Sequence, residues 1–146
     1  MRIKAILVCE DVRLEVAGTL TAVGIYNERL VVEPGEAPIV IPKFAVLVVL
    51  AGLKGTTRIA CRQRVARVGD PYEAPPPSMI AHEHSAENDE HSFVFQQTPL
   101  VVGAPGLFHF VFEARSDQGA LVHDYSFSIE RQPPAILAAP PPPAAA

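Results

Sequence analysis

Apolar and polar side chains alternate with a period of two along most of this chain, and Gly or Pro interrupts the alternation at short intervals. The clearest stretch is residues 106–130, where Phe108, Phe110 and Phe112 occupy every second position and residues 117–119 separate two alternating runs. Successive side chains of a strand point to opposite faces, whereas a helical face repeats about every 3.6 residues. The alternation therefore predicts strands joined by turns, with a hairpin in residues 106–130.

Residues 44–51 are the exception to this alternation, because every one of them is apolar. Such a run is typical of a central strand that is covered on both faces. With the alternating segments it gives about eight strands at short spacing, a number that favours two packed sheets. We predict an all-β fold, a two-sheet antiparallel β-sandwich of immunoglobulin-like or similar Greek-key topology. The chain contains no Trp, which disfavours a true immunoglobulin domain.

The length of 146 residues suits one domain. We predict that this domain covers residues 1–132 and that residues 69–91 form one long loop, because that stretch is rich in Pro, acidic residues and His. Residues 133–146 consist almost entirely of Pro and Ala. Because that composition cannot bury a core, we predict a disordered tail.

Charge and hydropathy limit the classes of partner. The chain carries 12 Lys and Arg against 16 Asp and Glu, so no overall positive field attracts nucleic acid. The longest apolar run, residues 44–53, is about half as long as a membrane-spanning helix, and the N-terminal apolar stretch is too short and too charged for a signal peptide. We therefore expect no membrane partner and a cytoplasmic location, where Cys9 and Cys61 would be buried free thiols.

Residues 6–15 read Ile-Leu-Val-Cys-Glu-Asp-Val-Arg-Leu-Glu, and a set of further positions follows at fixed places: Gly18, Leu20, Gly24-Ile25-Tyr26 and Ile41-Pro42-Lys43. This pattern, which covers roughly the first third of the chain, resembles a family of small bacterial proteins of unknown function. Residues 106–129 match it more loosely. The resemblance implies a bacterial, cytosolic, single-domain and mostly β protein, and it implies no activity and no catalytic residues.

Three imidazoles and four carboxylates fall within residues 82–91: His82, Glu83, His84, Glu87, Asp89, Glu90 and His91. Imidazole and carboxylate groups suit Zn, Ni or Fe, and His82 and His84 would share one side of an extended segment. A metal site formed by His82, His84 and His91 is one interpretation. A solvated loop tip is the other, since short His-rich tracts are only compositional evidence and nothing here supplies the groups that orient metal ligands.

Positive and negative charges are segregated in the middle of the chain. Five basic residues without an intervening acid are followed by six acids without an intervening base: Lys54, Arg58, Arg62, Arg64 and Arg67, then Asp70, Glu73, Glu83, Glu87, Asp89 and Glu90. Either Arg58, Arg62 and Arg64 form a face that binds an anionic partner, or the acidic stretch lies near the basic strand and the charges screen each other. Exposed pairs contribute about 0–1 kcal/mol each, so they would bias that stretch without locking it.

Other candidates for chemistry are weak. Glu10 and Asp11 are adjacent, so in a strand their carboxylates face opposite sides, whereas Asp11 and Arg13 share a side and can pair. His123 falls on the apolar side of its strand, where a core or interface His is commoner than a ligand. Signatures of nucleophilic, phosphate-binding, redox or zinc-protease sites are missing. We expect no catalytic residue and no cofactor.

Two functions from different classes follow. The first is a non-enzymatic binding or assembly module of the bacterial cytoplasm, which contacts a protein partner or another copy of itself through a sheet edge, the Arg58, Arg62 and Arg64 face, or residues 69–91. Its physical basis is the set of Pro-marked strand edges, since exposed edges invite the addition of another strand. The alternative is a metal-binding protein or metal-dependent enzyme centred on His82, His84 and His91.

Overall fold

The computed structural model describes residues 1–54, 57–69, 80–84 and 89–133, and for residues 57, 58 and 80–84 the description covers the main chain. All regular elements in these residues are strands, which confirms the predicted all-β class. They are β1 (Arg2–Leu14), β2 (Leu20–Ile25), β3 (Arg29–Val32), β4 (Ile39–Ile41), β5 (Phe44–Ala51), β6 (Thr57–Arg67), β7 (Ile80–His84), β8 (Glu90–Gln97), β9 (Leu100–Val102), β10 (Gly106–Ser116) and β11 (Gly119–Arg131). The count of eleven exceeds the predicted eight.

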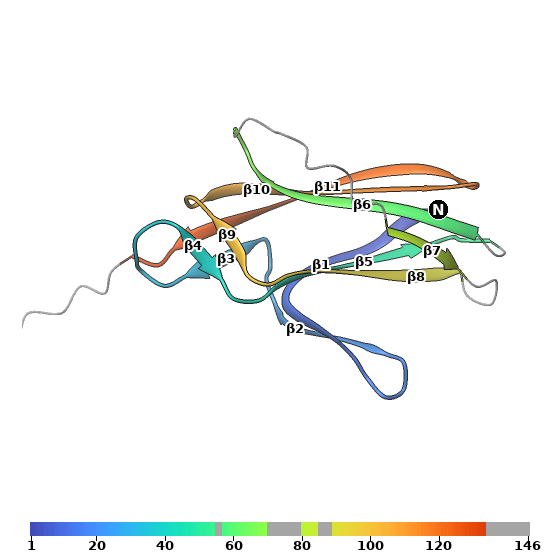
Figure 1. The fold of residues 1–146 in the computed structure, drawn as a ribbon, viewed down its shortest axis with the longest axis horizontal. Coiled ribbons are helices and arrows are strands. Elements are labelled where there is room, and N and C mark those ends of the chain that lie inside the picture. Colours follow the sequence, from blue (N-terminus) through green and yellow to red (C-terminus); the bar gives the residue numbers. More distant parts are fainter. Residues whose placement is uncertain (55–56, 70–79, 85–88, 134–146) are drawn as a thin grey trace, which may run out of the picture.

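The strands form two main layers. Sheet A has the order β2-β1-β5-β8, sheet B has the order β3-β11-β10-β6-β7, and β4 pairs with β9 in a separate ribbon. Figure 1 shows β6, β10 and β11 as one layer and β1, β5 and β8 as the other. All pairings in the described residues are antiparallel except that of β3 with β11. The architecture is a β-sandwich, as predicted. No helix in the described residues is long and apolar enough to cross a bilayer.

Aromatic rings fill the space between the two sheets. The ring centroids of Phe95 and Phe110 are 5.9 Å apart, and those of Phe93 and Phe112 are 6.1 Å apart. Phe93 and Phe95 belong to sheet A, whereas Phe110 and Phe112 belong to sheet B, so these rings join the layers. Aromatic pairs in this distance range contribute about 0.5–1.5 kcal/mol beyond their burial. The hairpin predicted from the alternating Phe residues is the pair β10 and β11.

The strand β5 is buried on both faces, as its uninterrupted apolar run predicts. Val46 and Val48 belong to the core between the sheets. Ala45 and Leu47 point to the other face of sheet A and belong to a second apolar cluster. That cluster also contains residues of β1 and β2, namely Cys9, Val12, Leu7, Leu20 and Ala22. The β1–β2 hairpin therefore covers part of the outer face of β5.

The long strand β1 changes partner halfway along. Residues 2–9 pair with β5, and residues 9–14 pair with β2. We call residues 10–25 the arm, because this hairpin leaves the body of the sandwich beyond sheet A (Figure 1). Near its tip Leu14 is 75% exposed and Val16 is fully exposed to solvent. The division of β1 into two paired halves also determines which of its edges stays open.

The prediction of one loop over residues 69–91 was wrong. Ile80–His84 forms β7, which pairs with β6, and Glu90 and His91 belong to β8. The sequence Ile-Ala-His-Glu-His contains only two apolar residues, so local composition gave no strand signal. Pairing with β6 supplies the main-chain hydrogen bonds that define this edge strand. Most of the other predicted loop and tail residues, 70–79, 85–88 and 134–146, lie outside the described residues.

Both cysteines are free and buried, as expected. Cys9 lies on β1 in sheet A and Cys61 on β6 in sheet B. Burial raises the pKa of the Cys61 thiol to about 11, and burial is also the main cause of the raised pKa of Cys9. Thiols with raised pKa values are poor nucleophiles, so neither cysteine is a candidate for catalysis.

Candidate functional site

The three His residues of the predicted metal site are divided between the two sheets. His82 and His84 lie on β7 at the edge of sheet B, in register with Ile59 and Thr57. His91 lies on β8 in sheet A, partly buried, with its ring edge-on to that of Phe93 at 4.8 Å. The described side chains include no group of three or more His, Cys, Asp or Glu that could hold a metal ion. Because the side chains of His82 and His84 lie outside the described residues, the metal site stays a prediction.

Two members of the predicted arginine face, Arg62 and Arg64, lie on the outer surface of sheet B. Arg62 forms an ion pair with Glu113, which is opposite it on β10. Arg64 is in register with Val111 on the same strand. The main chain of β7 places Glu83 opposite Arg58, although their side chains are not described. Since Glu113 neutralises Arg62 in place, this surface offers an anion less positive field than the sequence suggests.

A second polar cluster on the same surface was not predicted. His109 Nδ1 lies 2.7 Å from Asp124 Oδ1 and 3.2 Å from Ser126 Oγ. In a Ser-His-Asp catalytic site, the acid and the hydroxyl contact different ring nitrogens. Here both contact Nδ1, so the cluster lacks the proton path of such a site. Finding it required the β10–β11 register, which places Ser126 opposite His109 and Asp124 two residues earlier, opposite Val111.

The feature best suited to binding is an open edge of β1. The strand β5 occupies one edge along residues 2–9, but β2 occupies the other edge only along residues 9–14. Within the described residues, the edge of residues 2–7 that faces away from β5 carries no strand. Unpaired main-chain groups on such an edge are a template for a further strand. The sequence patterns alone did not indicate this edge, because it results from the unequal pairing of β1.

One hydrogen bond establishes the direction of the main-chain groups along this edge. The Tyr26 N–H donates to the Val8 carbonyl at 2.8 Å, just where the open stretch ends. In an antiparallel strand, the N–H and C=O of one residue point to the same edge, and alternate residues share that edge. The N–H and C=O of Ile6 therefore also point away from β5, toward the open side.

A cleft of about 280 Å³ lies directly beside this edge. Its lining joins three segments: Ile6, Leu7 and Val8 of β1; Ile25, Tyr26, Asn27 and Glu28 at the end of β2 and after it; and Tyr125 of β11. The cleft therefore lies at the open side of the sandwich, with walls from both sheets. Its volume is just below the range of about 300–1,000 Å³ that is usual for small-molecule pockets. It has room for a side chain rather than for a large ligand.

Burial and neighbouring carboxylates raise the pKa values of the two tyrosines of the cleft. Burial and the neighbouring Glu10 carboxylate, which accepts a hydrogen bond from the Tyr26 hydroxyl, raise the pKa of Tyr26 to about 12. Burial and the charge of Glu28 raise the pKa of Tyr125. Both hydroxyls therefore keep their protons at neutral pH, and the formal charge at the cleft is that of Glu10 and Glu28. No ion pair in the described residues includes either carboxylate.

Gly24 makes room for the Glu10 side chain. A Cβ atom at position 24 would lie 2.7 Å from both Cγ and Cδ of Glu10, and Gly24 has a φ of +64°. Any other residue would therefore be strained and would also displace Glu10. The neighbouring Asp11 points elsewhere, since its carboxylate accepts hydrogen bonds from Arg13 and Gln96. The sequence-based prediction that Glu10 and Asp11 diverge, and that Asp11 pairs with Arg13, is confirmed.

Comparison of the chain with protein-family models, curated proteins and solved structures found no match. The resemblance of residues 6–15 and the following positions to a bacterial family stays a prediction. The function is therefore inferred from the geometry of the described residues.

Proposed function

We propose that this protein is a non-enzymatic binding module that recognises a protein partner through the open edge of sheet A. The observation that supports the proposal most directly is the unpaired edge of β1 along residues 2–7. A strand edge with free N–H and C=O groups gains hydrogen bonds when an extended segment of another protein pairs with it. The cleft beside Ile6 supplies a place for a partner side chain.

The arrangement of ionisable groups also favours binding over catalysis. Glu10 and Asp11 diverge, and His109, Asp124 and Ser126 lie on the open surface of a sheet. A catalytic site needs groups that converge on one reacting atom, usually in a concave and partly dry environment. The described clusters lack that convergence, and the two buried thiols have raised pKa values.

A bacterial cytoplasmic location belongs to the same proposal. It is supported by the two free thiols, which a reducing compartment preserves, and by the resemblance of residues 6–15. The arginine face is a weaker candidate for the binding surface, since Arg62 is already paired with Glu113.

A proline substitution tests the open edge. Ile6→Pro removes the N–H that points away from β5 while leaving the hydrogen bonds between β1 and β5 in place. The matched control is Val94→Pro on β8, the opposite edge of sheet A, where the same alternation directs the N–H of Val94 away from β5. Thermal unfolding of both variants checks that they fold.

Each protein is immobilised and exposed to a lysate of the source organism, and the retained proteins are compared. We expect wild type and Val94→Pro to retain the same partner and Ile6→Pro to lose it. Retention of that partner by a folded Ile6→Pro variant, or the absence of any partner of the wild-type protein, would refute the proposal.

A further inference from the structure

We propose that the open edge of β1 and the cleft beside it form one groove for an extended peptide, with an apolar side chain in the cleft and a Lys or Arg side chain against Glu28. This inference rests on the proposed function and specifies the chemistry of the partner. We define the groove by Ile6, Tyr26, Glu28 and Tyr125.

The position of the cleft follows from the alternation of side chains in a strand. Ile6 pairs with Val48 and packs against the core between the sheets, so Ile6 is on the inner face of sheet A. A segment that pairs with β1 at Ile6 would direct every second side chain to this same face. There the cleft lies between Ile6 and Tyr125, which comes from sheet B. The main-chain contacts and the side-chain cavity thus belong to one binding geometry.

The aliphatic part of the cleft lining determines its first preference, beside the polar groups of Tyr26, Asn27 and Glu28. Ile6 and Ile25 provide aliphatic walls, and Ile25 is 49% exposed although it lines a concave surface. A Val, Ile or Leu side chain would cover these walls and remove apolar surface from water. These residue types also favour the extended conformation that strand addition requires.

Charge determines the second preference. Glu10 and Glu28 lie at the cleft, and the ion pairs of the described residues leave both carboxylates without a cation. Glu10 packs against Gly24 and contacts the Tyr26 hydroxyl, whereas the hydrogen bonds of Glu28 are made by its main chain, so Glu28 is the freer carboxylate to meet a new cation. A Lys or Arg two positions from the apolar residue would lie on the same face of the added strand. Opposite charge at this point would favour one class of peptide over others.

The backbone at Glu28 is a separate observation that points to its side chain. Glu28 has a φ of +63°, the only positive φ of a non-Gly residue in the described part of the chain. Its conformation is fixed by two main-chain hydrogen bonds, from its N–H to Tyr26 O at 3.1 Å and from Ser128 N–H to its own carbonyl at 2.8 Å. Gly would adopt this conformation without strain. A Glu in a backbone conformation that suits Gly, beside a cleft, favours a role of its carboxylate in binding.

A second copy of this chain fits the edge less well. Lys4 of β1 forms an ion pair with Glu90 of β8, on the far side of β5 from the open edge. A second copy that paired through residues 2–7 would therefore not bring this Lys to Glu28 as a free cation. We therefore assign the groove to a segment of a different protein.

The test uses short fluorescent peptides and the full-length protein. One peptide consists of β-branched residues with Ile at its centre and Lys two positions later; its matched control has Glu in place of that Lys. Fluorescence anisotropy at low salt gives both dissociation constants for wild type, Glu28→Gln and Ile6→Pro. Glu28→Gln keeps the shape of the side chain and removes only its charge.

We expect the Lys peptide to bind wild type about fivefold to tenfold more tightly than the Glu peptide. Glu28→Gln should remove most of this difference, and Ile6→Pro should abolish binding of both peptides. Equal affinities for the two peptides, or no binding of either, would overturn the inference. Light scattering that detects a dimer of wild type but not of Ile6→Pro would overturn it by identifying a second copy as the occupant. The proposed function fails separately, if Ile6→Pro retains the captured partner.

Discussion

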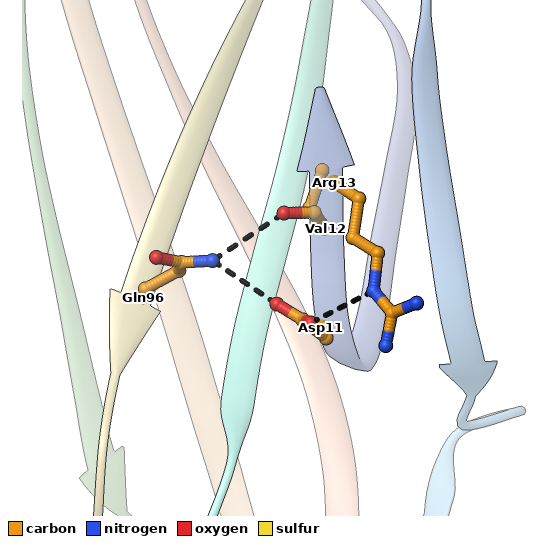
Figure 2. Close-up of polar contacts among 4 residues, drawn as sticks. All are labelled: Asp11, Val12, Arg13 and Gln96. Atoms are coloured by element: carbon orange, nitrogen blue, oxygen red, sulfur yellow. Dashed lines mark hydrogen bonds and ion pairs between the residues drawn. The ribbon is translucent and has the colours of Figure 1, made fainter. Parts of the chain in front are cut away.

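The side-chain amide of Gln96 donates a hydrogen bond to Asp11 Oδ1 at 3.3 Å, which links β8 to the arm across the intervening strand β5 (Figure 2). The same amide nitrogen donates to the Val12 carbonyl at 3.4 Å. Ala45 of β5 is in register with both Gln96 of β8 and Cys9 of β1. The arm begins directly after Cys9, so the Gln96 amide crosses β5 over the small side chain of Ala45. Ala45 is fully buried beneath this crossing.

The amide of Gln96 should stabilise the base of the arm. We expect Gln96→Ala to lower the free energy of unfolding by about 0.5–1.5 kcal/mol, since two partly exposed hydrogen bonds are lost. Hydrogen exchange followed by mass spectrometry should be faster in residues 11–23, where the arm strands pair, because local opening becomes easier. Gln97→Ala on the same strand is the control. Equal exchange of the arm in both variants would show that Gln96 does not hold it.

Local patterns in the sequence were sufficient for the strands whose burial is simple. The apolar run of β5 and the alternating Phe residues of β10 predicted a central strand and a hairpin, because each pattern follows directly from the face that is covered. The pattern failed for β7, which is an edge strand defined by pairing. Of the two alternatives for His123, core or interface, exposure on β11 excludes the core.

Local sequence patterns could not predict the candidate site, for a physical reason. Its edge exists because β2 pairs with a different half of β1 than β5 does, and pairing between distant segments leaves no periodic signal. The cleft joins Ile6 to Tyr125, which are far apart in the chain. The one local feature of the site is the positive φ of Glu28, and the sequence does not reveal φ values.

The metal-binding alternative yields a prediction of its own. If the protein is a binding module, untagged protein purified without added metal should hold no stoichiometric Zn, Ni or Fe, and a chelator should not change its melting temperature. Elemental analysis and thermal unfolding measure both. Stoichiometric metal that is lost when His82 and His84 are replaced by Ala would establish the alternative.

Replacement of Glu28 should separate stability from binding. Glu28→Gly removes the strain of a left-handed Glu, and we expect it to raise the free energy of unfolding by up to about 1 kcal/mol while weakening the Lys peptide. Glu33→Gly is the control: Glu33 precedes Pro34, where the backbone is extended, so Gly only adds freedom to the unfolded chain and should destabilise. Urea unfolding gives both values, and a loss of stability in Glu28→Gly would contradict the strain.

The ionisation of Tyr26 should make the fold sensitive to alkaline pH. Because its pKa is raised from 10 to about 12 in the folded protein, this group stabilises the fold below pH 10, and the contribution is lost as pH rises toward 12. Phenolate absorbance during an alkaline titration should show one tyrosine that titrates near pH 12. Tyr26→Phe should remove that step and weaken the decline of stability over this pH range. An unchanged titration curve in Tyr26→Phe would assign the late step to another tyrosine.

Three Gly→Ala substitutions should distinguish backbone strain from the contact with Glu10. Gly24 combines a positive φ with a close approach to Glu10, Gly18 has a φ of +76° but open space around it, and Gly103 has open space and no positive φ. We expect the free energy of unfolding to be unchanged in Gly103→Ala, to fall by about 1 kcal/mol in Gly18→Ala, and to fall further in Gly24→Ala, because Glu10 must move.

Movement of Glu10 also removes the acceptor of the Tyr26 hydroxyl, so Gly24→Ala alone should bring the pKa of Tyr26 back toward 10. Chemical denaturation and the alkaline titration measure the two effects on the same samples. Gly18→Ala and Gly24→Ala could instead lower the free energy of unfolding equally, with Tyr26 still titrating near pH 12. That result would mean that Gly24 is needed only for its positive φ and that other contacts hold Glu10 in place.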